Sequence, residues 1–134
     1  LERRYGLERV LTERELRFQE NLSRRPIASS KLGETQNGYW RLHYPDLVVT
    51  ASDRPTVYEI ELTAKSRRRL EAIVKAWRRA RHVERCVYLC LPGPTQEAVS
   101  GVVRRLKAEE RVAVVELPRR QPEAEEVFAR RAIG

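Results

Sequence analysis

Residues 43–65 read HYPDLVVTASDRPTVYEIELTAK, and this stretch decides the fold that the sequence predicts. Two runs rich in strand-forming residues, 47–50 and 57–62, flank a polar turn at 53–55. Aspartate and proline are typical turn residues, and two such runs joined by a short turn indicate a β-hairpin. The stretch therefore predicts two antiparallel strands around which the rest of the chain is organised.

This hairpin carries three acidic residues. Asp46 opens the first strand, and Glu59 and Glu61 share one face of the second because side chains alternate along a strand. Strand pairing brings Asp46 close to Glu59 or Glu61, and crowded carboxylates cost several kcal/mol unless a cation or a proton intervenes. Oxygen-rich clusters suit Mg²⁺ or Mn²⁺. The alternative is that the three acids line a solvated face or pair with neighbouring arginines.

The order of these residues resembles the PD-(D/E)xK nuclease superfamily: Pro-Asp, then Glu-x-Glu on the next strand, then a basic helix. The resemblance implies that Asp46 and Glu59 hold the metal ion. Glu61 stands at the position that is usually lysine, which helps to orient or activate the attacking water. Some members have glutamate there, and others carry the lysine on the following helix, where this chain has Lys65.

A second likeness covers roughly residues 40–117. The segments HYPDLVV, EIELTAKSRRRLEAIVKAW and CVYLCL follow one another in an order similar to the replication-relaxation family of bacterial plasmid and mobile-element proteins. That resemblance implies a DNA-binding, nuclease-like domain acting in plasmid replication or DNA relaxation. It also implies a restriction-endonuclease-like core, and we expect DNA as the partner.

A basic helix is predicted after the hairpin. Leu70, Ile73, Val74 and Trp77 follow the i, i+3, i+4, i+7 spacing of a helix packed on a sheet. Residues 65–81 contain eight basic residues and one acidic residue. Five of the basic residues fall off the apolar stripe and are expected to face solvent and bind phosphates: Arg67, Arg68, Lys75, Arg78 and Arg79. A solvated helix face with no ligand is the alternative.

Three further residues are candidates for the site. His43, two residues before Asp46, is an accessory candidate for metal binding, phosphate contact or proton transfer, or else an ordinary strand-end histidine. Thr12 and Glu15 have the spacing of a capping box, which predicts an N-terminal helix over about 12–22. Glu15 or Glu20 on that helix could supply another acid to the metal, although an exposed acid is the simpler interpretation.

The rest of the chain predicts an α/β domain. Residues 85–91 read as a strand buried on both faces, Thr95 is positioned to cap a second helix, and 111–117 form a last strand. Residues 23–38 indicate a loop or frayed strand, with a hairpin turn at 37–38. The predicted fold is a three-layer α/β/α restriction-endonuclease-like fold, in which a mixed sheet combines the antiparallel acidic hairpin with parallel additions.

The domain boundaries follow from this reading. A nuclease-like domain is expected over 1–117, with its core at 39–117, and a charged tail or short helix over 118–134. The first residue is leucine and the sequence contains no methionine, which indicates a piece of a longer protein.

Composition sets the remaining limits. The net charge is +8, which favours a polyanionic partner, although abundant arginine also follows from a GC-rich genome. Cys86 and Cys90 lie about 13 Å apart on a strand, beyond disulfide reach, which predicts buried thiols in a reducing cytoplasm. No apolar run is long enough for a membrane span. The oligomeric state stays open, and a homodimer is compatible with the sequence.

Two functional hypotheses follow. The first is metal-dependent DNA cleavage or nicking, with Asp46 and Glu59 as ligands of Mg²⁺ or Mn²⁺ and with Glu61 or Lys65 positioning water. The second is a catalytically inactive DNA-binding or protein-interaction module that keeps the nuclease fold.

Overall fold

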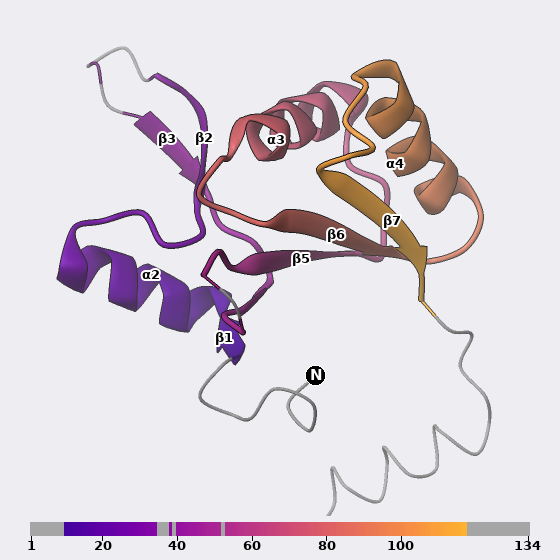
Figure 1. Ribbon diagram of the computed structural model, residues 1–134. Helices are drawn as coiled ribbons and strands as arrows, with labels where there is room; N and C mark the ends of the chain where they lie inside the picture. The colour runs from indigo at the N-terminus through magenta and orange to yellow at the C-terminus, as the bar shows by residue number, and fades with distance from the viewer. Residues whose placement is uncertain (1–9, 35–37, 39, 52, 118–134) are drawn as a thin grey trace, which may run out of the picture.

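The computed structural model describes residues 10–34, 38, 40–51 and 53–117. Those residues form a mixed α/β domain, in which a five-stranded mixed sheet is accompanied by three helices and a separate two-stranded sheet (Figure 1). The elements in chain order are β1 (Val10–Thr12), α2 (Glu13–Ser23), β2 (Ser30–Glu34), β3 (Trp40–His43), β4 (Leu47–Val49), β5 (Thr56–Glu61), α3 (Arg67–Arg79), β6 (Arg85–Cys90), α4 (Pro94–Arg105) and β7 (Val112–Glu116).

The main sheet has the strand order β1-β4-β5-β6-β7. β4 pairs antiparallel with both β1 and β5, whereas β6 runs parallel to β5 and to β7. The predicted acidic hairpin is therefore confirmed as β4 and β5, and the predicted parallel additions are confirmed as β6 and β7. β1 was not predicted, because the first ten residues show no strand pattern.

One face of the sheet carries the hydrophobic core. α3 and α4 lie side by side above it (Figure 1), joined to the sheet by the connections that parallel strands require. The apolar stripe predicted for α3 is confirmed, because Leu70, Ile73, Val74 and Trp77 are all buried. Val48, Val57 and Tyr88 meet them from the sheet, and Val99, Val102 and Val103 complete the core from α4.

The opposite face of the sheet is less covered by the described residues. Val87 and Leu89 on the central strand β6 are only partly buried, so the prediction of burial on both faces is wrong for this strand. Ile60 and Val115 on the same face are 37% and 46% exposed. The third layer is not seen among the described residues, and both this layer and the restriction-endonuclease-like assignment stay predictions.

The N-terminal helix is confirmed as α2. Thr12 is its N-cap, and its hydroxyl oxygen accepts a hydrogen bond from the backbone N–H of Glu15 at 3.3 Å. Of the apolar residues on α2, Leu16 is buried in the common core, whereas Phe18 and Leu22 are exposed. A single buried leucine explains why the helical periodicity is weak in the sequence.

Two local predictions need comment. Of the loop or frayed strand expected over 23–38, the strand is present at 30–34 as β2, which pairs antiparallel with β3 with an irregular register and packs beside α3. The prediction that Thr95 caps α4 is wrong, because the helix starts two residues earlier than that cap would give, with Gly93 as N-cap and Pro94 as its first residue. A proline at that position needs no hydrogen-bond partner for its nitrogen, so it sets the helix start itself.

Some predictions lie outside the described residues. These are the turn residue Asn37 and the tail or short helix over 118–134. Within the described part of the chain, no helix is long and apolar enough to cross a membrane.

Candidate functional site

The pairing of β4 with β5 sets Asp46 beside Glu59. Leu47 lies opposite Tyr58 and Val48 opposite Val57, and Asp46 directly precedes β4. The backbone N–H of Asp46 donates to the carbonyl of Tyr58 at 3.0 Å although Tyr58 is already the partner of Leu47, so the regular register ends at that pair. The charge of Asp46 raises the pKa of Glu59, which places the two carboxylates near one another. The expected proximity of Asp46 to the glutamates is therefore present.

Asp46 also makes a hydrogen bond that crosses the hairpin. Its Oδ2 atom accepts from the backbone N–H of Ile60 at 2.7 Å. Because Ile60 lies between Glu59 and Glu61, this bond ties the aspartate to the strand that carries both glutamates. The bond is charge-assisted, a class that is stronger than a hydrogen bond between neutral groups.

Glu59 is a buried carboxylate held by His43. The residue is only 2% exposed, and His43 Nε2 lies 3.1 Å from each of its two carboxylate oxygens. Burial raises the pKa of Glu59, His43 partly opposes that rise, and the charge of Asp46 adds to it. His43 itself packs edge-on against Trp77, with ring centroids 5.9 Å apart. The accessory candidate from the sequence is therefore in direct contact with the acidic pair.

Glu61 is paired with Lys65. Glu61 is 3% exposed, and the ammonium of Lys65 forms an ion pair with its Oε1 atom. Lys65 precedes α3, whose N-cap is Ser66, so it belongs to the connection between strand and helix. Lys65 therefore reaches Glu61 from the segment before the helix, and not from the helix on which the resemblance placed it. Its charge also lowers the pKa of Glu59.

Asp46 and Glu59 do not form a closed metal cage. In residues 10–34, 38, 40–51 and 53–117 no group of three or more His, Cys, Asp or Glu side chains could hold a metal ion. Mg²⁺ commonly uses one or two carboxylates and keeps several waters or binds substrate phosphate. A divalent ion at these two acids would therefore need water or phosphate to complete its coordination.

The acids of α2 are not part of this site. Glu15 is exposed and its carboxylate accepts from the Thr12 hydroxyl at 3.0 Å. Glu20 is buried, and its oxygens accept hydrogen bonds from the backbone of residues 27–29 and from the Ser29 hydroxyl. Neither residue contacts the acidic pair in these bonds. The simpler interpretation, an exposed acid, holds for Glu15 and is wrong for Glu20, which is buried and has a structural role.

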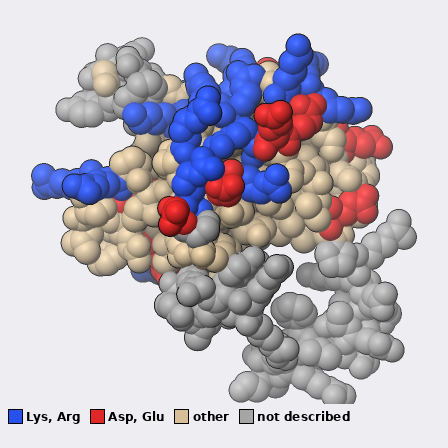
Figure 2. Space-filling model, viewed as in Figure 1, with Lys and Arg blue, Asp and Glu red and all other residues tan. Residues whose placement is uncertain are grey.

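The five predicted phosphate-binding residues are exposed on α3, as expected. Figure 2 shows lysine and arginine side chains gathered on the helix-covered side of the molecule, over α3. Two of the five face α4: Arg67 forms an ion pair with Glu71, and Arg78 donates to the carbonyl of Leu106 at 2.6 Å. Arg68 lies on the opposite side of the helix, toward β3.

A basic hollow adjoins the acidic pair. It has a volume of about 460 Å³ and lies between β3 and the start of α3. Arg41 and Arg69 line it together with Arg68, and His43 lines the end that touches Glu59. The sequence analysis did not assign Arg41 or Arg69 to the site. The signal for Arg41 was its two-residue spacing from His43, which places both on one face of a strand.

Two buried polar groups near the acids were also missed. Tyr88 lies opposite Glu59 in the parallel ladder, and among the described residues neither its hydroxyl nor the indole nitrogen of Trp77 has a hydrogen-bond partner. Burial raises the pKa of Tyr88, and the charges of Glu59 and Glu61 raise it further. The register between two parallel strands joined through a helix is not readable from the sequence, so nothing there predicted this neighbour.

Comparison with protein-family models, with curated proteins and with solved structures finds no match for this chain.

Proposed function

We propose that the chain is a DNA-binding, nuclease-like domain of a plasmid or mobile-element replication or relaxation protein, with a restriction-endonuclease-like fold. One observation carries the proposal: Asp46 and Glu59 lie close together at the end of an antiparallel hairpin, and His43 joins Glu59 to Trp77 on the basic helix. Carboxylates that hold a divalent ion and arginines that hold phosphates are the two parts that phosphodiester chemistry requires. The domain acts in the cytoplasm.

In this proposal Asp46 and Glu59 bind Mg²⁺ or Mn²⁺. A divalent ion there supplies electrophilic stabilisation of phosphate and lowers the pKa of bound water. Lys65, held by Glu61, contributes a positive charge beside the pair, at the place where a strand lysine is usual in PD-(D/E)xK nucleases. Either Lys65 or Glu61 positions the attacking water, and the hollow lined by Arg41, Arg68 and Arg69 receives the phosphate backbone.

The test is nicking of supercoiled plasmid in the presence of Mg²⁺ or Mn²⁺. Asp46→Asn is the informative variant, because its amide oxygen can still accept the hydrogen bond from Ile60 while the charge is lost. Asp53→Asn is the matched control, since Asp53 is an exposed acid in the turn of the same hairpin. Asp46→Asn should abolish nicking and Asp53→Asn should retain it. If the wild type nicks plasmid neither with Mg²⁺ nor with Mn²⁺, the proposed nuclease activity is rejected.

A second function is favoured by the pairing of the glutamates. Glu59 is occupied by His43 and Glu61 by Lys65, as expected for a module that binds DNA and does not cleave it. DNA binding without cleavage, independent of added metal ion, supports this alternative. Its affinity should fall with salt at a log–log slope of about −0.9 per phosphate contacted. Binding that is absent or insensitive to salt indicates instead a protein-interaction module whose basic helix meets an acidic partner.

A further inference from the structure

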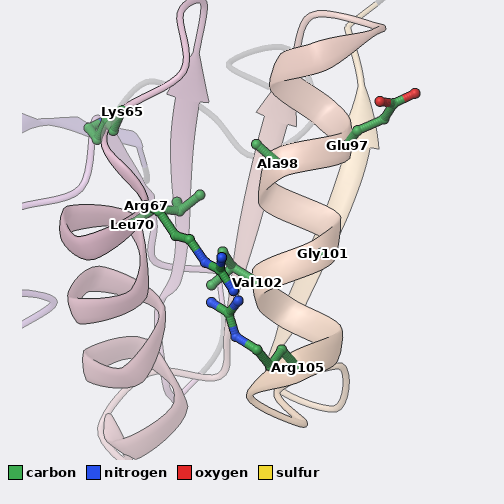
Figure 3. Close-up of a pocket in the computed structure, with 8 residues that line it drawn as sticks. All are labelled: Lys65, Arg67, Leu70, Glu97, Ala98, Gly101, Val102 and Arg105. Carbon is green, nitrogen blue, oxygen red and sulfur yellow. The ribbon is translucent and has the colours of Figure 1, made fainter.

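A notch of about 330 Å³ lies between α3 and α4. Leu70 and Val102 form part of its apolar lining, and charged side chains reach it from both helices (Figure 3). Arg67 comes from α3 and Arg105 from α4, and Figure 3 shows their guanidinium groups pointing toward one another inside the notch. Glu97 also lines the notch, but its carboxylate points away from the two arginines.

The two arginines share one carboxylate. Arg67 Nε lies 3.3 Å from Glu71 Oε1, and Arg105 forms an ion pair with the same oxygen. These contacts join one nitrogen of each guanidinium to a single acceptor, although each guanidinium has five N–H donors. The two guanidinium groups thus share one carboxylate, which leaves one positive charge unbalanced. Glu71 holds both guanidinium groups in their orientation.

We propose that this notch is a second phosphate-binding site, in which Arg67 and Arg105 grip a backbone phosphate of the bound nucleic acid and Glu71 positions them beforehand. Two planar forks converging from different helices match the several oxygens of a phosphate better than a single lysine would. This proposal rests on the proposed function. It adds α4 to the interface, through a residue outside the basic helix.

Lys65 connects the notch to the acidic pair. It lines the notch and is ion-paired with Glu61, which lies two residues beyond Glu59 on the same strand face. A nucleic-acid strand with one phosphate at Asp46 and Glu59 therefore meets Lys65 next and the two arginines after it. This continuity favours a polymer of phosphates over an acidic peptide or a single free anion.

Arg105→Ala is the first test, with Arg104→Ala as its matched control. Both arginines are exposed residues of α4, but only Arg105 lines the notch. Affinity for a short duplex, measured by fluorescence anisotropy over a salt series, should fall about tenfold for Arg105→Ala. The log–log salt slope should also shrink by about 0.9, the value for one phosphate contact. Equal effects of the two variants overturn the proposal.

Glu71→Gln should change the affinity for the duplex in the direction opposite to Arg105→Ala. Loss of its charge removes the internal competitor for the arginines, so the affinity for the duplex should rise. Glu97→Gln, which removes the same charge at the rim of the notch, measures how much of that rise is due to net charge alone. In Glu71→Gln the amide oxygen of the substituted side chain can still accept from both arginines, so their positions are kept. An affinity that falls in Glu71→Gln, or rises no more than in Glu97→Gln, shows that Glu71 does not compete with phosphate for the two arginines and contradicts the proposal.

The proposal for the notch and the proposal for the acidic pair can be tested separately. Mn²⁺ binding, followed by titration calorimetry, should be unchanged in Arg105→Ala because Arg105 is not a ligand in the proposed metal site. A protein that binds the duplex through Arg105 without nicking it supports the notch and rejects cleavage. If the wild type and Arg105→Ala nick plasmid equally well, the phosphate-binding role of the notch is rejected and the proposed nuclease activity is not. Polyglutamate and unlabelled duplex can also be compared as competitors of the labelled duplex. If polyglutamate competes at the lower concentration, the notch binds an acidic protein and not nucleic acid, which overturns the proposal.

Discussion

Glu20 provides the prediction whose size follows most directly from the structure. Its Oε2 atom accepts three backbone N–H groups, from Ile27 at 2.9 Å, Ala28 at 3.0 Å and Ser29 at 2.9 Å. Its Oε1 atom accepts the Ser29 hydroxyl at 2.6 Å. Ala28 and Ser29 are almost fully buried, so water cannot easily replace the lost acceptor.

Glu20→Ala should therefore destabilise the protein severely. A buried donor left without a partner costs about 1–3 kcal/mol, so the two fully buried N–H groups give about 2–6 kcal/mol. Domains of this size are stable by about 5–15 kcal/mol, so the loss is a large fraction of the total. Glu20→Gln keeps one acceptor oxygen for the backbone N–H groups, and its amide N–H₂ can donate to the Ser29 hydroxyl oxygen in place of the bond that the second carboxylate oxygen accepts. It should therefore cost less, about 1–2 kcal/mol, chiefly through the lost charge assistance.

Urea denaturation of the three proteins measures these differences. Gln19→Ala is the control, since Gln19 is the exposed neighbour of Glu20 on the same helix. The expected order of stability is wild type, then Glu20→Gln, then Glu20→Ala, with Gln19→Ala close to the wild type. If Glu20→Ala and Gln19→Ala unfold at the same urea concentration, the four hydrogen bonds do not hold this loop, and the reasoning is refuted.

Two further predictions concern pH and thiol chemistry. Burial raises the pKa of Glu59 above its ordinary value of 4.5, so the folded protein keeps a proton there that the unfolded chain releases. The free energy of unfolding should therefore fall as pH rises through that raised pKa. Glu59→Gln should remove the contribution of Glu59 to this pH dependence. If the free energies of unfolding of the two proteins follow parallel curves with pH, the prediction is refuted. Cys86 and Cys90 are buried and free, and burial raises the pKa of Cys90 to about 11. Both thiols should react with a chromogenic disulfide reagent only after denaturation, and rapid labelling of the native protein contradicts their burial.

The hairpin and the helical stripe were predictable because their signals are local. Glu59 and Glu61 are two residues apart, and the apolar residues of α3 repeat at helical spacing, so both patterns lie within a few residues. The pairing of β4 with β5 also follows from the short turn between them. For these reasons the sequence predicted the convergence of Asp46 with Glu59 correctly.

The parts that failed depend on distant partners. β1 is three residues long and is stabilised by pairing with β4, more than thirty residues later. Glu20 looks like a surface acid until the loop at 27–29 folds back onto it. The contact between Arg105 and Glu71 joins two helices whose relative rotation is set by core packing, which no single-sequence pattern records.

The bond from Asp46 to the amide of Ile60 has a consequence for how such domains diverge. A slip of one residue between the strands would turn Glu59 and Glu61 to the other face, and this bond opposes such a slip. Aspartate at this position therefore has an architectural reason to persist, whatever chemistry its carboxylate performs. Retention of Asp46 among related proteins is for that reason weak evidence of catalytic activity. Retention of Glu59, the glutamate beside His43, is stronger evidence.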